Sequence, residues 1–356
     1  MFTAYLMKWT TLTLTLSVAF VNAIQSIDVV VTGPSSINTV ANLKVVTTIS
    51  NTGDEALKIL NDPLGPFSDL PTDIFDITST TGGKKPTFTG MIVEPASEIN
   101  AADVDFTSLS PGQSVNMNHD LSLSYDFSES GAGTYSIAPH NHFRVRTIGD
   151  LGNLTDLYAS VQPLTVIISG TLVIGRPSSS MEKRAWFTGC TAAQTNALYS
   201  AASEAQIYAA SAVDYLQSHT STTPRYTTWF GEYTAARHDY VLNTYFKLAM
   251  NKFYTSFSYY CTCTSTTGRL YVYPKSYGII YICPNSGFFN SRISNGSYTQ
   301  AGSLIWAASQ FVDNGGAQQH SSAVADTKSL AISDPEKAIR NAISYDFFVE
   351  NTPSQD

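Results

Sequence analysis

The chain has 356 residues and a formal net charge of −8, and 13% of its residues are charged. A chain of this length has room for about two domains. The sequence has no basic patch with interleaved aromatic residues, which argues against nucleic-acid binding.

Residues 1–23 have the pattern of a secretory signal peptide. One basic residue, Lys8, precedes an apolar stretch over residues 12–21, and small residues follow up to Ala23. The alternative is an N-terminal membrane anchor, but the apolar stretch is short for a span and no basic stop-transfer cluster follows it. We therefore predict a secreted, extracellular product that has no membrane-spanning segment.

Residues 24–184 are predicted to form a β-rich pro-domain. Short β-rich runs, such as residues 27–31 and 164–168, alternate with turns that contain Gly and Pro, and long helical periodicity is absent. This pattern is typical of an all-β, sandwich-like domain. The region ends in a polar linker with the dibasic pair Lys183-Arg184. Because exposed linkers are where proteases cut, we predict processing by a kexin-type protease at this pair.

Residues 185–356 are predicted to form an α+β domain that is mainly helical, with a small antiparallel sheet. Apolar residues recur at helical spacing, and short β-rich runs joined by Gly-containing turns lie between the helical stretches. The predicted helices cover residues 192–218, 228–250, 299–312, 321–332 and 334–344, and the predicted strands cover residues 254–263, 268–273 and 278–283.

All four cysteines lie in this second region, at Cys190, Cys261, Cys263 and Cys283. An even number of cysteines behind a signal peptide indicates two disulfides, and four cysteines allow three pairings. A bond between Cys261 and Cys263 is disfavoured, because residues two apart on a strand point the same way but lie too far apart. Two pairings remain open, and a structural zinc site is disfavoured in an oxidising compartment.

Two Asn-x-Ser/Thr sequons predict N-glycosylation, at Asn153 and at Asn295. The first lies in the region that we expect to be removed. Asn295 is therefore the glycosylation site predicted for the mature protein.

Motifs throughout the second region carry a resemblance to a known family. They are Ser218-His-Thr, Thr223-Pro-Arg-Tyr-Thr-Thr-Trp-Phe-Gly231, Cys261-Thr-Cys263, Tyr271-Val-Tyr-Pro274, Asn314-Gly-Gly316 and Phe348-Val-Glu-Asn351. These stretches resemble the deuterolysin-like (aspzincin) zinc metalloendopeptidases, and among them the peptidyl-Lys metalloendopeptidase branch. The resemblance implies a signal peptide, a removable pro-domain and a zincin-like catalytic domain. It also implies the disulfides Cys190–Cys261 and Cys263–Cys283.

The resemblance also locates the family's metal site on this chain. In the family, two His of a His-Glu-x-x-His helix and an Asp of a downstream loop bind zinc, and the Glu activates the zinc-bound water. The ligand positions fall here on Trp306, Gln310 and Gln319, the general-base position on Ala307, and the oxyanion-stabilising Tyr position on Ser322. Trp cannot ligate zinc and amide side chains bind it poorly, so we predict no intact catalytic residue, no bound metal and no cofactor.

The predicted specificity pocket differs from the family as well. The Asp that pairs with the substrate lysine in this branch falls on Ile343, whereas a nearby acidic position is retained as Asp346. A lysine ammonium beside Ile343 has no charge partner. We therefore do not expect lysine selection, even with a restored metal site.

Other candidate ligands are weaker. His219 and His238 lie in helical stretches, where a surface or core role is favoured over ligation, and His320 adjoins a lost ligand position. His140-x-His142 has the spacing that puts both rings on one face of a strand, which is a weak metal signal. A serine hydrolase is disfavoured because the sequence has no Gly-x-Ser-x-Gly motif.

These observations favour a secreted pseudoprotease that keeps its cleft as a binding surface for a peptide or protein ligand, with its own pro-domain as a further partner. One alternative is an active metalloendopeptidase with a relocated or non-standard site. The other is a structural secreted protein whose cleft is closed by Trp306. An open pocket around Trp306, Gln310 and Gln319 favours binding, and a filled one favours the structural role.

Overall fold

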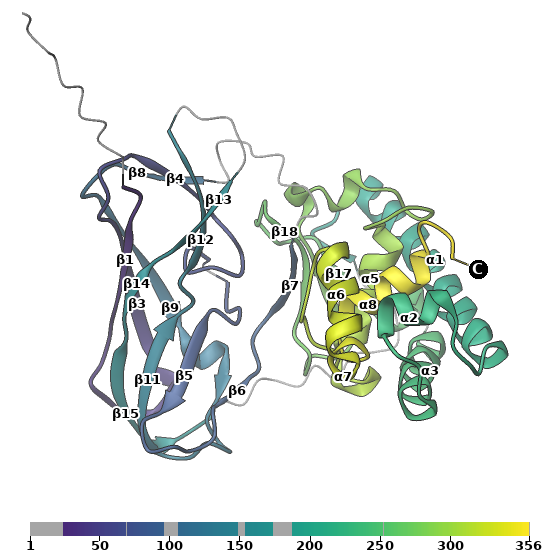
Figure 1. The fold of residues 1–356 in the computed structure, drawn as a ribbon, viewed down its shortest axis with the longest axis horizontal. Coiled ribbons are helices and arrows are strands. Elements are labelled where there is room, and N and C mark those ends of the chain that lie inside the picture. Colours follow the sequence, from purple (N-terminus) through teal and green to yellow (C-terminus); the bar gives the residue numbers. More distant parts are fainter. Residues whose placement is uncertain are drawn as a thin grey trace, which may run out of the picture.

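The computed structural model describes residues 24–68, 70–95, 106–148, 154–173, 187–251 and 253–355. A β-rich part, built from the first half of the chain, lies beside a mainly helical part from the second half (Figure 1). The prediction of mixed α and β structure is confirmed. The predicted signal peptide, the dibasic pair Lys183-Arg184 and the sequon at Asn153 lie outside the described residues.

The described strands of the β-rich part form small sheets. Their strand orders are β14-β1-β3-β9, β2-β15-β11-β5, β13-β12-β4-β8 and β10-β6. The strands are β1 (Ile27–Thr32), β2 (Ser36–Thr39), β3 (Lys44–Asn51), β4 (Leu57–Leu60), β5 (Phe75–Ser79), β6 (Thr87–Phe88), β8 (Phe106–Leu109), β9 (Ser114–Asp120), β10 (Tyr125–Asp126), β11 (Gly133–Pro139), β12 (His142–Thr147), β13 (Thr155–Tyr158), β14 (Ser160–Gln162) and β15 (Leu164–Thr171).

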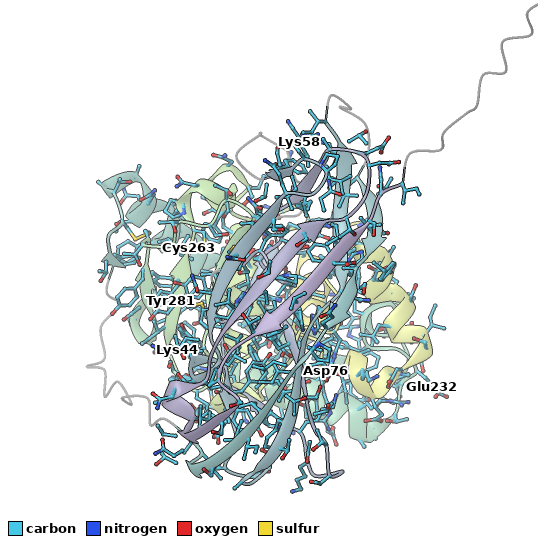
Figure 2. All side chains as sticks on the ribbon, turned by 90° about the vertical axis from the view of Figure 1, so that its left-hand side faces the viewer. Lys44, Lys58, Asp76, Glu232, Cys263 and Tyr281 are labelled. Atoms are coloured by element: carbon cyan, nitrogen blue, oxygen red, sulfur yellow. A yellow bond between two sulfur atoms is a disulfide. The ribbon has the colours of Figure 1, made fainter. Side chains whose placement is uncertain are left out.

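The strands of the β-rich part bury one face and expose the other. In β3, Val45, Thr47 and Ile49 are buried, whereas the residues between them are less so. Successive side chains of a strand point to opposite faces, so this alternation creates one apolar face. Charged side chains such as Lys44 and Asp76 lie on the outside (Figure 2).

The helical part is built around α1, which packs against α3 and α5. The Thr191 side chain accepts a hydrogen bond from the Gln194 backbone N–H, and the Gln194 side chain accepts one from the Thr191 N–H. This reciprocal capping box fixes the first turn of α1. The helices are α1 (Ala192–Ser218), α2 (Pro224–Phe230), α3 (Ala235–Met250), α4 (Phe253–Ser256), α5 (Gln300–Ser309), α6 (Val324–Ser333), α7 (Pro335–Ala338) and α8 (Ala342–Glu350).

Three predicted helices or strands differ from the structure, and the sheet predicted to be antiparallel is mixed, because Phe187–Thr188 and Ile279–Ile282 each pair parallel with Ser258–Tyr260. The predicted helix 228–250 is two helices, because Gly231 ends α2 with a φ of 81° and Thr234 caps a new helix, α3. The predicted helix 334–344 is also two helices, α7 and α8, separated at Ile339 to Asn341. The predicted strand 254–263 begins as helix α4 and contains only the short strand β17 (Ser258–Tyr260).

A five-stranded sheet joins the two parts of the chain. Its order is β16-β17-β19-β18-β7, and β7 (Ile92–Pro95) comes from the β-rich half. Strand β7 lies at the edge of the helical part and pairs antiparallel with β18 (Figure 1). The sheet therefore crosses the boundary expected between the two domains. The other strands are β16 (Phe187–Thr188), β17 (Ser258–Tyr260), β18 (Gly268–Val272) and β19 (Ile279–Ile282).

The disulfides Cys190–Cys261 and Cys263–Cys283 are both present, as the resemblance implies. They tie the residues that follow β17 to the start of the helical part and to the end of β19. Among the described residues, no helix has the length and apolar character needed to cross a bilayer.

Candidate functional site

Helix α5 carries the predicted metal motif, and it is buried on every side. All of its residues, including Trp306 and Ala307, are buried. The Thr299 hydroxyl caps its N-terminus by accepting a hydrogen bond from the Gly302 N–H at 3.0 Å. A helix that is buried on every side, with its few polar side chains hydrogen-bonded, lies in a core. Trp306 and Ala307, the motif positions within α5, therefore face the protein interior and not an open cleft.

The three predicted ligand positions do come together, but they bind one another. The Trp306 indole N–H donates to Gln319 Oε1 at 2.7 Å, and Gln319 Nε2 donates to the Ser321 carbonyl at 2.7 Å. Gln310 Nε2 donates to the Trp306 carbonyl at 3.1 Å. We call Trp306, Gln310 and Gln319 the amide cluster. Its polar groups are hydrogen-bonded within the protein, except for Gln310 Oε1, which has no hydrogen-bond partner among the described residues.

The amide cluster does not fit a zinc ion. Zinc requires about four donors from imidazole, thiolate or carboxylate groups, or from water. The indole N–H is only a hydrogen-bond donor, and Gln310 Oε1 is a single neutral acceptor. Ala307 supplies a methyl group where a general base is expected. In the part of the chain that the structure describes, no group of three or more His, Cys, Asp or Glu side chains is placed to hold a metal.

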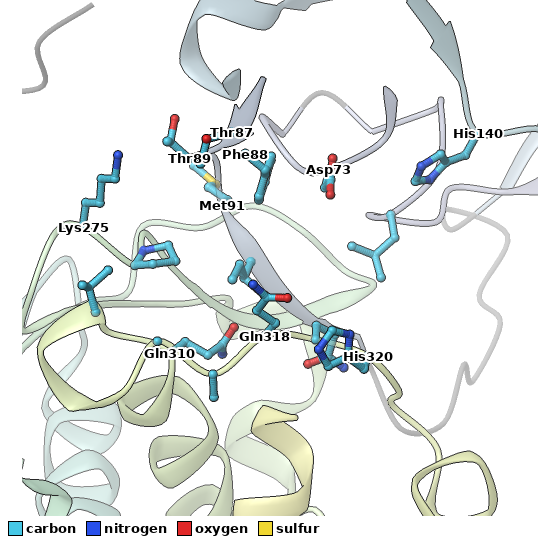
Figure 3. A pocket seen from close by; sticks show the side chains of 17 residues that line it. Asp73, Thr87, Phe88, Thr89, Met91, His140, Lys275, Gln310, Gln318 and His320 are labelled. Atoms are coloured by element: carbon cyan, nitrogen blue, oxygen red, sulfur yellow. The ribbon is translucent and has the colours of Figure 1, made fainter. Parts of the chain in front are cut away.

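An open pocket lies directly above the amide cluster, between the two parts of the chain. It has a volume of about 720 Å³. Gln310, Gln319 and His320 line it from the helical part, and Asp73 and His140 line it from the β-rich part (Figure 3). Trp306 is fully buried and does not line this pocket. The indole therefore fills the space below the amides and leaves the pocket above them open.

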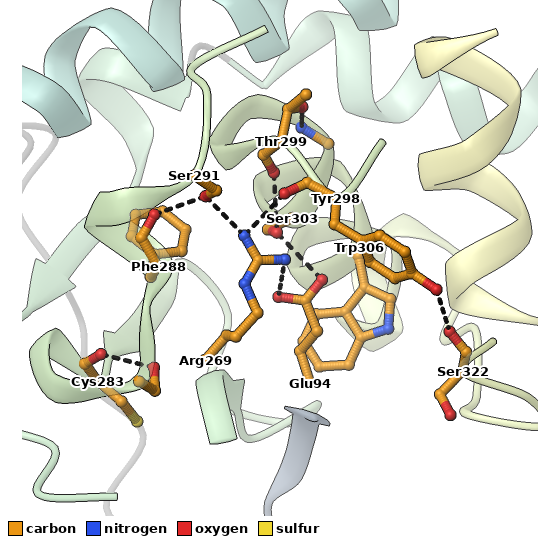
Figure 4. Close-up of polar contacts among 12 residues, drawn as sticks. Glu94, Arg269, Cys283, Phe288, Ser291, Tyr298, Thr299, Ser303, Trp306 and Ser322 are labelled. Atoms are coloured by element: carbon orange, nitrogen blue, oxygen red, sulfur yellow. Dashed lines mark hydrogen bonds and ion pairs between the residues drawn. The ribbon is translucent and has the colours of Figure 1, made fainter. Parts of the chain in front are cut away.

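The predicted oxyanion position, Ser322, lies at the exposed rim of the site. Its carbonyl accepts a hydrogen bond from the Tyr298 hydroxyl at 3.2 Å (Figure 4). The position thus holds a neighbouring tyrosine in place through its backbone. It brings no phenol of its own into the pocket.

The histidines are dispersed. His320 lines the pocket, and partial burial, with a smaller contribution from Lys337, lowers its pKa. His142 pairs with Asp156 at 2.8 Å. His219 stacks on Tyr215, and His238 Nε2 lies 3.0 Å from the Leu216 carbonyl. His219 and His238 thus have packing and backbone partners, which agrees with the structural roles expected for them.

A second buried polar group surrounds the predicted specificity residue Asp346. Both Asp346 and Ile343 are buried, and neither oxygen of the Asp346 carboxyl receives a hydrogen bond from an N–H or O–H among the described residues. The Glu350 carboxyl accepts hydrogen bonds from the backbone N–H groups of Tyr298, at 3.0 Å, and Thr299, at 2.6 Å. Gly302 in α5 makes room for both acids, since a Cβ there would collide with Asp346 Oδ1.

Burial decides the protonation of these two acids. Desolvation raises the pKa of Glu350 to about 7, although its backbone hydrogen bonds oppose the shift. Desolvation, and then the neighbouring Glu350, raise the pKa of Asp346 well above its usual range. Two adjacent carboxyl groups that share a buried site cannot both ionise easily. At least one of them therefore keeps a proton near neutral pH.

An ion pair between the two parts of the chain completes this group. Arg269 Nη1 on β18 lies 3.3 Å from Glu94 Oε2 on β7, and both side chains are almost fully buried. The Ser303 hydroxyl of α5 donates to Glu94 Oε1 at 3.0 Å (Figure 4). The Arg269 guanidinium attracts the Asp346 carboxylate, whereas the Glu94 carboxylate repels it. We call Glu94, Arg269, Asp346 and Glu350 the carboxylate cluster.

Sequence reasoning did not find the Glu94–Arg269 pair. Arg269 falls in a correctly predicted strand, and nothing in the sequence around Glu94 distinguishes it from an exposed acid. Charged side chains are almost never fully buried without a partner. The partner becomes visible only when the pairing of β7 with β18 is known.

Comparisons with known proteins place this chain beside a group of peptidases. Residues 215–350 match the aspzincin family described as lysine-specific metallo-endopeptidase. The peptidyl-Lys metalloendopeptidase of Grifola frondosa is 41% identical over 94% of this chain and 95% of its own length. That of Armillaria mellea is 41% identical over 96% of each chain. An extracellular protease of Aeromonas hydrophila is 24% identical over 88% of this chain and 89% of its own.

One solved structure is similar over part of the chain. The zinc peptidase from Grifola frondosa is 43% identical, covers 47% of this chain and 100% of its own, and has a TM-score of 0.45.

The family and relative names correct one prediction. The substituted motif positions predict no cofactor, whereas the relatives are named as metalloendopeptidases and the family as aspzincins, which points to zinc. The predicted absence of a cofactor is therefore contradicted. Because the amide cluster does not fit zinc, a zinc ion in this chain requires donors other than those at the three motif positions.

Proposed function

Because this chain belongs to the aspzincin family of lysine-specific metallo-endopeptidases, we propose that it is a secreted, metalloendopeptidase-like protein whose cleft binds peptide or protein segments without hydrolysing them. The observation that carries the proposal is the placement of Trp306. At a position where the family has a zinc ligand, this side chain is fully buried and its indole N–H donates to Gln319.

The chemistry of the motif supports this proposal. Metal-dependent peptide hydrolysis needs a polarised water and a group that accepts its proton. Ala307 has no proton acceptor, and the polar atoms of the amide cluster are neutral at every ordinary pH. Hydrolysis at this position therefore lacks both its metal ligands and its base.

The pocket favours binding over a purely structural role. Its volume of about 720 Å³ lies in the range of small-molecule and peptide side-chain sites. Polar side chains from both parts of the chain line it. The pro-domain is thus one partner of this surface, and a peptide or protein segment that takes its place is another.

Several features of maturation belong to the same proposal. They are the signal peptide at residues 1–23, the sandwich-like form of the pro-domain, cleavage after Lys183-Arg184 and glycosylation at Asn153 and Asn295. Asn295 is exposed, as a glycosylation acceptor must be. Secretion is supported by the name of the Aeromonas hydrophila relative, an extracellular protease.

The competing function is metal-dependent proteolysis by a relocated site. It is favoured by the names of two relatives that are 41% identical over almost the whole chain. A purified sample decides between the two functions, because only the competing function predicts cleavage that a chelator abolishes.

The test uses the full chain, before and after treatment with a kexin-type protease. Cleavage of a denatured protein is mapped by mass spectrometry with and without chelator, and zinc per chain is measured alongside. We expect no chelator-sensitive cleavage from the natural sequence. A variant that carries Trp306→His, Ala307→Glu, Gln310→His and Gln319→Asp is the matched control for zinc retention. Chelator-sensitive cleavage by the natural sequence would falsify the proposal.

A further inference from the structure

Strand β7 occupies the edge of the helical part as an added strand. Ile92 lies opposite Val272, Val93 opposite Tyr271, and Glu94 opposite Leu270, in antiparallel register. An extended segment that joins a sheet edge in this way gains affinity from its main chain, and side-chain pockets give it specificity. The edge of β18 is therefore able to hold an extended peptide segment.

A bulge in β18 aims one side chain at the added strand. The register shifts between Gly268 and Leu270, so Arg269 has no directly opposite residue on β7. Bulges redirect a side chain while pairing continues on either side. Arg269 Nη2 donates to Ser291 Oγ and to the Tyr298 carbonyl, both at 2.9 Å. These two contacts fix the guanidinium in the buried space beneath the strand.

The remaining guanidinium nitrogen depends on the added strand. Arg269 Nη1 has no hydrogen-bond partner among the described residues, and its ion pair is with Glu94 Oε2 at 3.3 Å. The other carboxylate oxygen of Glu94 accepts from Ser303 at 3.0 Å. The helical part thus presents one cation and one hydroxyl, and the strand supplies the carboxylate that joins them (Figure 4).

The charges of this site select against a basic strand residue. A lysine in place of Glu94 puts its ammonium next to the Arg269 guanidinium in a buried setting, where like charges repel strongly. The nearest acids, Asp346 and Glu350, already contact each other, and burial favours their protonated forms. A carboxylate completes the site, and an amide fits it sterically without neutralising Arg269.

We propose that the edge of β18, with Arg269 and Ser303, is a binding site for extended peptides that carry a glutamate, and that β7 fills it with Glu94 in the intact chain. The inference rests on the proposed function, since it names the class of peptide that the cleft binds. This class is opposite in charge to the lysine that names the relatives.

The test displaces β7 from the edge of β18 in the full chain and adds the sequence of β7 as a separate peptide. Glu94→Arg places a like charge against Arg269 and releases β7 from its position. Labelled peptides of residues 86–95 carry Glu, Gln or Lys at the position of Glu94, and fluorescence anisotropy reports binding. We expect the Glu peptide to bind about tenfold more tightly than the Gln peptide, and the Lys peptide to bind least.

Two controls isolate the charge. Glu129→Arg makes the same charge change at an exposed acid of the β-rich part, so β7 stays seated and no peptide binds. Adding Arg269→Gln to the opened chain brings the Glu and Gln peptides to within about twofold of each other. Equal binding of the three peptides to the opened chain, or preference for the Lys peptide, overturns the inference.

Hydrogen exchange gives a second measurement if the Glu94→Arg chain does not fold. Glu94→Gln keeps the size of the side chain, and we expect faster exchange of the amides in β18 but not in β1. Unchanged exchange in β18 contradicts the inference. Peptide cleavage during the binding assay contradicts the proposed function instead, because the inference depends on the preference for glutamate alone.

Discussion

Helix α5 separates two buried polar groups of opposite character. The amide cluster extends from Trp306, and the carboxylate cluster contacts Ser303 through Glu94. These two positions are three residues apart on one helix and lie on adjacent turns. The amide cluster contains no titratable side chain. The carboxylate cluster contains three acids and one arginine, all buried.

The amide cluster occupies the positions that carry the reaction in the family, whereas the carboxylate cluster lies at the position predicted to recognise the substrate. At the position of the family's metal motif, neutral side chains hydrogen-bond to one another and to the backbone, and none of them is a base that could take a proton from water. Beside the predicted specificity residue Asp346, the buried Arg269 guanidinium forms an ion pair with Glu94 from the β-rich part. Buried charges are costly unless they are paired. The helical part is therefore incomplete at the carboxylate cluster when β7 is absent, but complete at the amide cluster.

The largest expected effect is at Arg269. Arg269→Met leaves the Glu94 carboxylate buried without its cation, and we expect a loss of about 3–5 kcal/mol in the free energy of unfolding. Urea denaturation of the full chain, followed by tryptophan fluorescence, measures this loss. Adding Glu94→Gln should recover most of it, because no uncompensated charge then remains.

Arg144→Met is the matched control for this measurement. Arg144 pairs with Asp62 at 2.8 Å, but both side chains are about a third exposed. Solvent-exposed pairs contribute roughly 0–1 kcal/mol. If the two arginine variants lose the same stability, burial does not distinguish the carboxylate cluster from the surface.

A smaller effect is expected in the pH dependence of stability. The pKa of Glu350 is raised to about 7 by burial, so the folded chain holds a proton that the unfolded chain releases near the ordinary pKa of 4.5. Stability from this group is therefore present below that value and is lost as the pH rises toward about 7. We expect Glu350→Gln to remove a pH-dependent change on the order of 1–3 kcal/mol.

Thermal unfolding between pH 4 and 8 measures this change as the difference between the natural chain and Glu350→Gln. The difference is needed because other groups titrate in the same range. Burial lowers the pKa of His320, for example, and its contribution has the opposite sign. Parallel curves for the two chains would show that the carboxylate cluster does not titrate in this range.

Sequence patterns correctly predicted the helices and strands that are determined by residues close together in the sequence. The helix expected over residues 192–218 matches α1, because its cap and its buried alanines and leucines follow one another in the sequence. The helix expected over residues 228–250 failed at Gly231, whose positive φ ends α2 where apolar spacing alone suggests continuation. The backbone conformation of Gly231 ends the helix, and the spacing of apolar residues does not reveal this end.

The candidate site divides in the same way. The resemblance correctly brought Trp306, Gln310 and Gln319 together, because their spacing on one helix and the next loop is set locally. It did not bring Glu94 to Arg269, because that contact depends on a strand that crosses from one part of the chain to the other. Long-range strand pairing leaves no periodic signal in either segment.

The smallest expected effect on stability is at Gln310. It tests whether the uncharged amide cluster contributes less to stability than the carboxylate cluster. Gln310→Met removes a buried amide oxygen that has no hydrogen-bond partner among the described residues, together with one hydrogen bond to the Trp306 carbonyl. That carbonyl keeps the Ser309 hydroxyl, which donates to it at 2.8 Å. We therefore expect stability to stay within about 1 kcal/mol of the natural chain, as measured by urea denaturation.

Glu94→Met is the matched apolar replacement in the carboxylate cluster, and it should cost about 3–5 kcal/mol because Arg269 loses its counter-charge. The two variants change side chains of similar size, so volume does not explain the difference between them. If Gln310→Met instead lowers the free energy of unfolding by more than about 2 kcal/mol, the Gln310 amide interacts with a further group that is lost with it. A metal ion bound through Gln310 is one such group, and the neutral description of the amide cluster would then fail.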